Sequence, residues 1–197
     1  MAADLAHTIP NASPETAISI SQQAPPLIQS TKSYPWPLSL FLSSETQDQW
    51  TTVENLFVSC LRTGDDESAR KLLDSLIDRF GERNERVMAY SGMYAESKIE
   101  SDKDFIDVLK EYGEALEENP ANMHLQKRRI ALLRSKGKIA EATSQLVNLC
   151  EVSPTDAEAW AELASIYVQQ SMFEQAIFAL EEVLLIMPNA WNVSCHC

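Results

Sequence analysis

From Gln49 onward, apolar residues recur along the chain at spacings of three and four, which is the period of an amphipathic helix. Two clear runs of this kind are Val53, Leu56, Phe57 and Cys60, and then Leu72, Leu73, Leu76 and Ile77. Few stretches show the period-two alternation that is typical of strands. The pattern therefore predicts an all-α body.

The first 45 residues follow a different pattern, because they contain six of the nine prolines. Proline lacks an amide donor and fixes φ, so a long helix is excluded there. One short helix is allowed, with Ser13 as N-cap, Pro14 at the first helical position and a continuation to Gln23. We interpret the rest, including the apolar but proline-broken Tyr34–Leu42, as a partly disordered linker. Docking of Tyr34–Leu42 onto the domain surface is the alternative.

The three remaining prolines, Pro120, Pro154 and Pro188, are evenly spaced. Their period of about 34 residues predicts an α-solenoid of antiparallel helix pairs. Reading back from Pro188, the pattern positions hold Trp160, Leu163, Ala164, Tyr167, Ala176 and Leu180. This spacing resembles the tetratricopeptide repeat, with alanine in place of a glycine and leucine in place of an aromatic residue. We expect these side chains to pack together and the proline to end the second helix.

Shifting the pattern by one proline period at a time gives the organisation of the whole chain. Ala142, Leu146 and Pro154 fall in register, whereas Gln126 and Arg129 occupy the tryptophan and leucine positions. One repeat further back, the stretch from Gly92 to Pro120 is too long by about one helical turn, so we expect an insertion near 99–104. The predicted segments are a proline- and serine-rich segment (1–45), a degenerate helix pair (46–84), tetratricopeptide-like repeats (85–122, 123–156 and 157–190) and a non-repeat tail (191–197).

Several runs are more specific than a generic repeat: Arg86–Met93, Lys127–Ala131, Lys136–Ala142, Glu158–Tyr167 and Phe178–Glu182. Over about residues 46–190 the chain resembles subunit 2 of the endoplasmic reticulum membrane protein complex. The resemblance implies a non-enzymatic cytosolic scaffold, peripheral on the endoplasmic reticulum membrane, in a complex that inserts and stabilises membrane proteins. Its partners would be other subunits of that complex, and it would meet the membrane only through them.

Family members continue into further repeats, whereas this chain stops shortly after Ala190. We therefore expect a truncated or alternatively spliced product, or a mispredicted gene model. A second hypothesis from a different class is a soluble tetratricopeptide adaptor that binds short peptide tails of client proteins or chaperones.

The formal net charge is −13, with 29 acidic and 16 basic side chains. That excess argues against binding of nucleic acid, which needs clustered Lys and Arg. The charge is nevertheless uneven, since residues 123–140 carry six basic groups and no acidic one, and residues 141–197 carry eight acidic groups and no basic one.

The candidate protein-binding residues are Lys127, Arg128, Arg134, Glu158 and Glu162, on the first helices of two successive repeats. In such arrays the first helices line the concave surface, so these side chains could grip a charged segment of a partner. The alternative is a solvated helix face with ion pairs between adjacent repeats.

Candidate chemistry elsewhere in the chain is weak. Cys195-His196-Cys197 lacks the second ligand pair that a structural zinc site needs, so we expect no metal. Cys60 and Cys150 lie on apolar helix faces, which favours core residues over nucleophiles. With no glycine loop for phosphate and no paired-carboxylate motif, we expect no enzyme activity and no cofactor.

Overall fold

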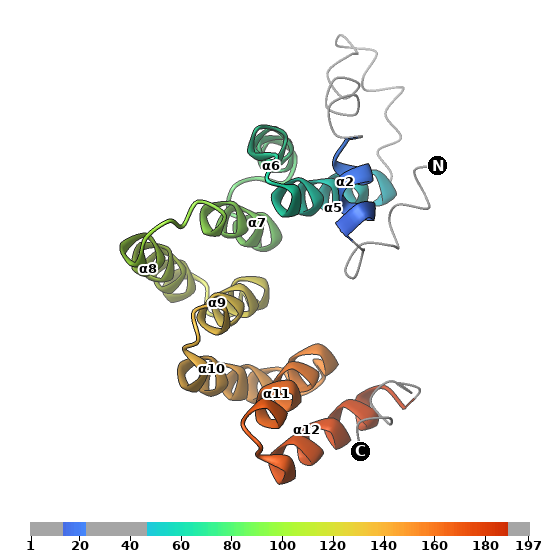
Figure 1. The fold of residues 1–197 in the computed structure, drawn as a ribbon, viewed down its shortest axis with the longest axis vertical. Coiled ribbons are helices and arrows are strands. Elements are labelled where there is room, and N and C mark those ends of the chain that lie inside the picture. Colours follow the sequence, from blue (N-terminus) through green and yellow to red (C-terminus); the bar gives the residue numbers. More distant parts are fainter. Residues whose placement is uncertain (1–13, 23–46, 189–197) are drawn as a thin grey trace. The chain divides into compact units, whose positions relative to one another are not determined.

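The computed structural model describes residues 14–22 and 47–188, and every regular element within those ranges is an α-helix (Figure 1). The prediction of an all-α protein is therefore confirmed. By their internal contacts, the residues form two compact units that divide between Asp104 and Phe105. The segments Tyr34–Leu42 and 191–197 lie outside the described residues.

The first unit contains the helices α2 (Pro14–Ser21), α5 (Gln47–Thr63), α6 (Asp66–Phe80) and α7 (Glu85–Glu96). The short helix expected at Pro14 is α2, and it packs on α5. Its residue Ile20 is 2% exposed and joins a buried cluster with Leu56, Phe57 and Leu73. These apolar contacts bring a proline-bounded segment onto the helical body.

The second unit holds most of α8 (Asp102–Glu118) and then α9 (Met123–Ser135), α10 (Ile139–Val152), α11 (Ala157–Gln169) and α12 (Phe173–Ile186). From α9 to α12, each helix packs against the next one along the chain. The buried layer between them consists of the apolar residues that recur every three or four positions, such as Ile130, Leu146, Leu163 and Val183. The division of the chain into repeats stays a prediction.

The helices α7, α9 and α11 begin in the same way, after an asparagine or an aspartate. The side chains of Asn84, Asn122 and Asp156 are N-caps that accept hydrogen bonds from backbone N–H groups of the first helical turn. Each cap satisfies donors that have no partner within the helix. Asn122 is fully buried, so its capping bond to Leu125 N (3.0 Å) also satisfies a polar side chain in the core.

The helices α8, α10 and α12 end at Glu118, Val152 and Ile186, each two residues before a proline. A proline disfavours helical backbone at the residue before it, so the helix stops there. The even spacing of the prolines thus becomes an even spacing of helix ends.

The pair α7 and α8 is longer than the pairs that follow. Residues 97–101 join α7 to α8, whereas the shorter segments 136–138 and 170–172 join α9 to α10 and α11 to α12. Helix α8 also has 17 residues, against 14 in α10 and in α12. In the loop, Ser101 and Asp104 cap each other, because each side chain accepts a hydrogen bond from the other's backbone N–H. The extra length therefore lies in the loop and in α8.

Candidate protein-binding face

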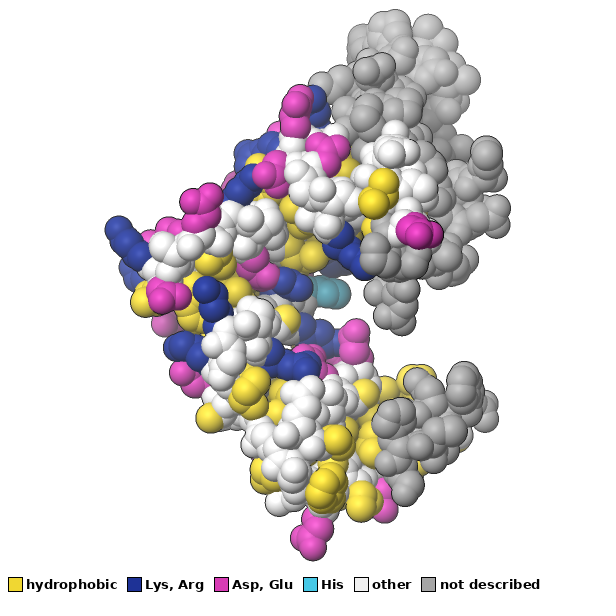
Figure 2. Space-filling view, viewed as in Figure 1, with side chains coloured by type: hydrophobic (Ala, Val, Ile, Leu, Met, Phe, Trp, Pro, Cys, Tyr) yellow, Lys and Arg dark blue, Asp and Glu magenta, His cyan; other side chains and the backbone are white. Residues whose placement is uncertain are grey.

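The five candidate residues lie on two neighbouring first helices of the second unit, with Lys127, Arg128 and Arg134 on α9 and Glu158 and Glu162 on α11. We call this set the charged face. In Figure 2 basic and acidic side chains gather together where α9 meets α11. The structure brings four of the five together as ion pairs between the two helices.

Lys127 is the centre of the first group of ion pairs. Its Nζ lies 2.8 Å from Oδ2 of Asp156 and 2.7 Å from Oε2 of Glu158. Burial lowers the pKa of Lys127, but the hydrogen bonds and charges of Asp156 and Glu158 outweigh that effect, and the pKa lies above its ordinary value. Because Asp156 is also the N-cap of α11, Lys127 ties α9 to the first turn of α11.

Arg134 and Glu162 form the second pair, about two turns further along α9 and about one turn further along α11. Nη1 of Arg134 donates to Oε1 of Glu162 at 2.6 Å, and the two side chains are 28% and 25% exposed. Both line a hollow of about 360 Å³ together with Ala131, Ser135, Ile139 and Gln169. A partly buried, paired charge at the rim of a hollow has a fixed position, and its hydrogen bonds are directional.

Arg128 lies between these pairs and is half-buried. The contacts within the charged face are those of the second interpretation made from the sequence, and binding of a partner there stays a prediction. Its ion pairs join adjacent helices, and its outer atoms, above all those of Glu158 with a side chain that is 81% exposed, still meet solvent.

The residues expected to pack within the repeats differ in how far they are buried. Six of them are buried: Gly92, Ala142, Leu146, Leu163, Ala164 and Ala176. Trp160, Tyr167 and Leu180 are half-buried, and Pro120, Pro154 and Pro188 are exposed. Trp160 and Tyr167 are half-buried because they line an open hollow between α10, α11 and α12.

Asp156 is a residue beside the charged face that the sequence interpretation missed. It caps α11 and forms an ion pair with Lys127, and both roles depend on its place two residues after Pro154. The sequence held a signal for this cap. Asn122, the equivalent residue one repeat earlier, also stands two residues after a proline, Pro120, and it caps α9.

Gln126 is a second residue whose role the sequence pattern concealed. It stands where the repeat expects tryptophan, and by side-chain type it is a poor match. In the structure, Nε2 of Gln126 donates to the carbonyl of Pro120 at 2.6 Å, and Nε1 of Trp160 donates to the carbonyl of Pro154 at 3.0 Å. The two side chains make the same contact one repeat apart.

Within 14–22 and 47–188, no helix is both long and apolar enough to cross a membrane. Within the same ranges, no group of three or more His, Cys, Asp or Glu side chains is placed to hold a metal ion.

Antiparallel helix pairs, asparagine and aspartate caps in a regular register and prolines after the second helices define a tetratricopeptide-repeat protein. The solved structure of a thermophilic tetratricopeptide-repeat protein from Thermus thermophilus has the same fold, with a TM-score of 0.58 at 17% identity over 93% of this chain and 96% of that one. Residues 84–193, more than half of the chain, match the family described as the EMC2 TPR-like repeat domain. The chain belongs to this family.

Two curated relatives illustrate the similarity. The TPR repeat protein oca3 of Schizosaccharomyces pombe is 39% identical over 139 residues, which cover 71% of this chain and 48% of that protein. The ER membrane protein complex subunit 2-B of Xenopus laevis is 32% identical over 142 residues, which cover 72% of this chain and 46% of that protein. The aligned region thus spans about half the length of these relatives.

Proposed function

We propose that this chain is a non-enzymatic scaffold subunit of the endoplasmic reticulum membrane protein complex. It works on the cytosolic face of the membrane and supports the insertion and folding of membrane proteins through protein–protein contacts. The observation that carries this proposal is the family match over residues 84–193. The relatives named as subunit 2 of that complex support it.

The charged face supplies a physical basis for assembly. Because Lys127 and Arg134 are held by Asp156, Glu158 and Glu162, their positions are set before a partner arrives. Because these side chains are already held in place, ordering them on association costs less conformational entropy. Charges arranged in this way contribute more to the choice and orientation of the partner than to raw affinity.

The direct test is co-purification from membranes. An affinity-tagged chain, expressed in its cells of origin and extracted in mild detergent, should bring down membrane-spanning subunits at a constant stoichiometry. The complex should survive washes at about 0.5 M salt, where exposed charge contacts are screened. Release of every membrane subunit by such a wash would contradict the scaffold role and favour a transient peptide adaptor.

A charge swap tests the face itself. Arg134→Glu with Glu162→Arg retains an ion pair between α9 and α11 but reverses its direction. We expect unchanged helicity and a marked loss of co-purified subunits. The matched control is Arg70→Glu with Asp74→Arg, which reverses an exposed ion pair on α6 outside this face. Equal assembly of the swapped protein and the control would show that the charged face does not contact the complex.

A further inference from the structure

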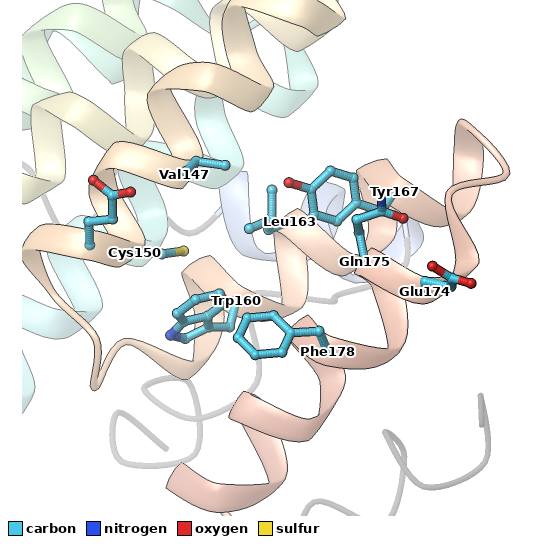
Figure 3. A pocket seen from close by; sticks show the side chains of 9 residues that line it. Val147, Cys150, Trp160, Leu163, Tyr167, Glu174, Gln175 and Phe178 are labelled. Carbon is cyan, nitrogen blue, oxygen red and sulfur yellow. The ribbon is translucent and has the colours of Figure 1, made fainter.

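An aromatic hollow lies between α10, α11 and α12 (Figure 3). It has a volume of about 430 Å³, within the range of protein clefts that hold ligands. Its apolar lining comes from all three helices and consists of Val147, Cys150, Trp160, Leu163, Tyr167 and Phe178. Glu151, Glu174 and Gln175 complete the lining with polar groups.

An aromatic pair lines one side of the hollow. The rings of Trp160 and Phe178 lie next to each other in Figure 3. They meet edge to face with their centroids 6.0 Å apart. Phe178 is 55% exposed although it is one of the largest apolar side chains of α12. The Trp160 N–H is already bonded to the carbonyl of Pro154, so the ring needs no further polar partner. The pair therefore offers apolar surface to an incoming side chain.

Cys150 lies at the wall of the hollow and is only 1% exposed. Burial, with a smaller effect from the Asp156 and Glu162 charges, raises the pKa of Cys150 to about 11. The sulfur is accordingly a neutral thiol at physiological pH and packs as a small apolar group.

Two carboxylates line the hollow, Glu151 from α10 and Glu174 from α12. Glu151 and Glu174 are both exposed, and neither forms an ion pair with the residues that the structure describes. The sequence contains no Lys or Arg from residue 139 to residue 188, so the helices that form the hollow supply no cation to neutralise them. A cation held between an aromatic ring and a carboxylate would gain from both.

This hollow is separate from the charged face. On an α-helix with about 3.6 residues per turn, Glu158 and Glu162 project from the opposite side of α11 to Trp160, Leu163 and Tyr167. A partner bound in the hollow would therefore not compete with one bound to Glu158 and Glu162.

We propose that the hollow formed by α10, α11 and α12 binds a protein segment in which a Lys or Arg lies next to a large apolar side chain. The apolar side chain packs against Trp160 and Phe178, and the basic group pairs with one of the two carboxylates, Glu151 of α10 or Glu174 of α12. Aromatic side chains in a hollow that is surrounded by polar groups are the usual arrangement of a binding hot spot. The charge complementarity selects a basic segment over an acidic or neutral one.

The test uses two short peptides of equal length with blocked ends. One has the core Leu-Lys-Phe-Arg-Leu and the other Leu-Glu-Phe-Glu-Leu. Each is titrated calorimetrically into the full chain, while the indole N–H resonance of Trp160, assigned with Trp160→Phe, is followed by NMR. We expect the basic peptide to bind and to shift that resonance, and the acidic peptide to do neither.

Two variants with matched controls locate the binding. Phe178→Ala should weaken the basic peptide about tenfold or more, whereas Phe173→Ala, at a more exposed phenylalanine of α12 outside the hollow, should not. Glu151→Gln with Glu174→Gln should weaken it about fivefold. Asp107→Asn with Glu111→Gln removes the same charge from α8 and should leave binding unchanged.

Three outcomes would overturn the proposal. The first is no binding of the basic peptide, and the second is equal binding of both peptides. The third is self-association of the chain that Phe178→Ala abolishes, because it would make a second copy the occupant of the hollow. The peptide titrations use the isolated chain and do not depend on assembly with the membrane complex. The peptide-binding proposal and the scaffold role can therefore be refuted separately.

Discussion

At the scale of single residues, the turn between α11 and α12 contains an unfavourable backbone conformation. Ser171 has a φ of 60°, and it is the only non-glycine residue with positive φ among those that the structure describes. The equivalent turn one repeat earlier, between α9 and α10, has Gly137 with a φ of 72°. A side chain in the left-handed region costs roughly 1–2 kcal/mol, which glycine avoids.

We therefore expect Ser171→Gly to raise the free energy of unfolding by about 1 kcal/mol. The reciprocal change, Gly137→Ser, should lower it by a similar amount. Urea denaturation followed by circular dichroism measures both. A loss of stability in Ser171→Gly would mean that the serine side chain contributes more than the backbone strain costs.

Asp156 joins two stabilising roles that substitution can separate. Asn retains the capping oxygen, as Asn122 does for α9, but removes the charge that faces Lys127. We expect Asp156→Asn to lower the free energy of unfolding by about 1 kcal/mol at pH 7, and Asp156→Ala by about 2 kcal/mol. Denaturation of the two variants beside the unaltered chain gives the comparison.

The Asp156 effect should also depend on pH. Burial raises the pKa of Asp156, but the hydrogen bonds from Lys127 and from the backbone N–H groups of α11 lower it by more. An aspartate with a lowered pKa stabilises the fold above its unfolded pKa of about 3.9, and the effect disappears as the pH falls through the folded value. The advantage over Asp156→Asn should therefore shrink below about pH 4. An advantage that stays constant through this range would exclude the charge as its source.

At the scale of the helices, one contact recurs with different side chains. Gln126 on α9 and Trp160 on α11 each donate to the carbonyl of the proline six residues earlier. The bond holds the first turn of each helix against the loop that precedes it. Only Trp160 also supplies an aromatic surface, which lines the hollow between α10, α11 and α12.

This difference predicts the effect of substituting each residue. Gln126→Ala and Trp160→Phe each lose the hydrogen bond and should cost about 1 kcal/mol of unfolding free energy. Trp160→Ala also removes half-buried aromatic surface and should cost about 3 kcal/mol. Thermal and urea unfolding of the three variants measures these costs. A cost of Trp160→Ala no larger than that of Trp160→Phe would show that the ring contributes nothing to packing.

At the scale of the second unit, α10 and α12 have equivalent residues with unequal burial. Leu146 and Cys150 of α10 are buried, whereas their equivalents one repeat later, Leu180 and Leu184 of α12, are half-exposed. Phe173 and Ile177 on the same helix are 61% and 47% exposed, and yellow side chains are visible along α12 in Figure 2. An apolar patch of this kind favours association.

We expect the chain to self-associate through α12, and Phe173→Lys with Ile177→Lys to reduce that association. Sedimentation velocity over a concentration series measures it. Glu174→Lys with Glu181→Lys is the control, because it adds positive charge to α12 without removing apolar surface. Equal association of both variants would attribute the effect to charge and not to the apolar face.

The sequence by itself determined the local features of this protein. Apolar spacing indicated helices, and the proline period indicated the tetratricopeptide fold, because helix formation and termination depend on neighbouring residues along the chain. Asn122 and Asp156 could have been identified as caps from the same register.

Only the tertiary structure decided which side chains meet across helices. Arg134 and Glu162 lie far apart along the chain, and the aromatic hollow needs three helices in place before it exists. It also decided that Trp160 and Leu180 are half-buried while Ala142 and Leu146 are buried. Burial and pairing depend on which neighbouring helix covers a face, and a helical pattern marks an apolar face without identifying what covers it.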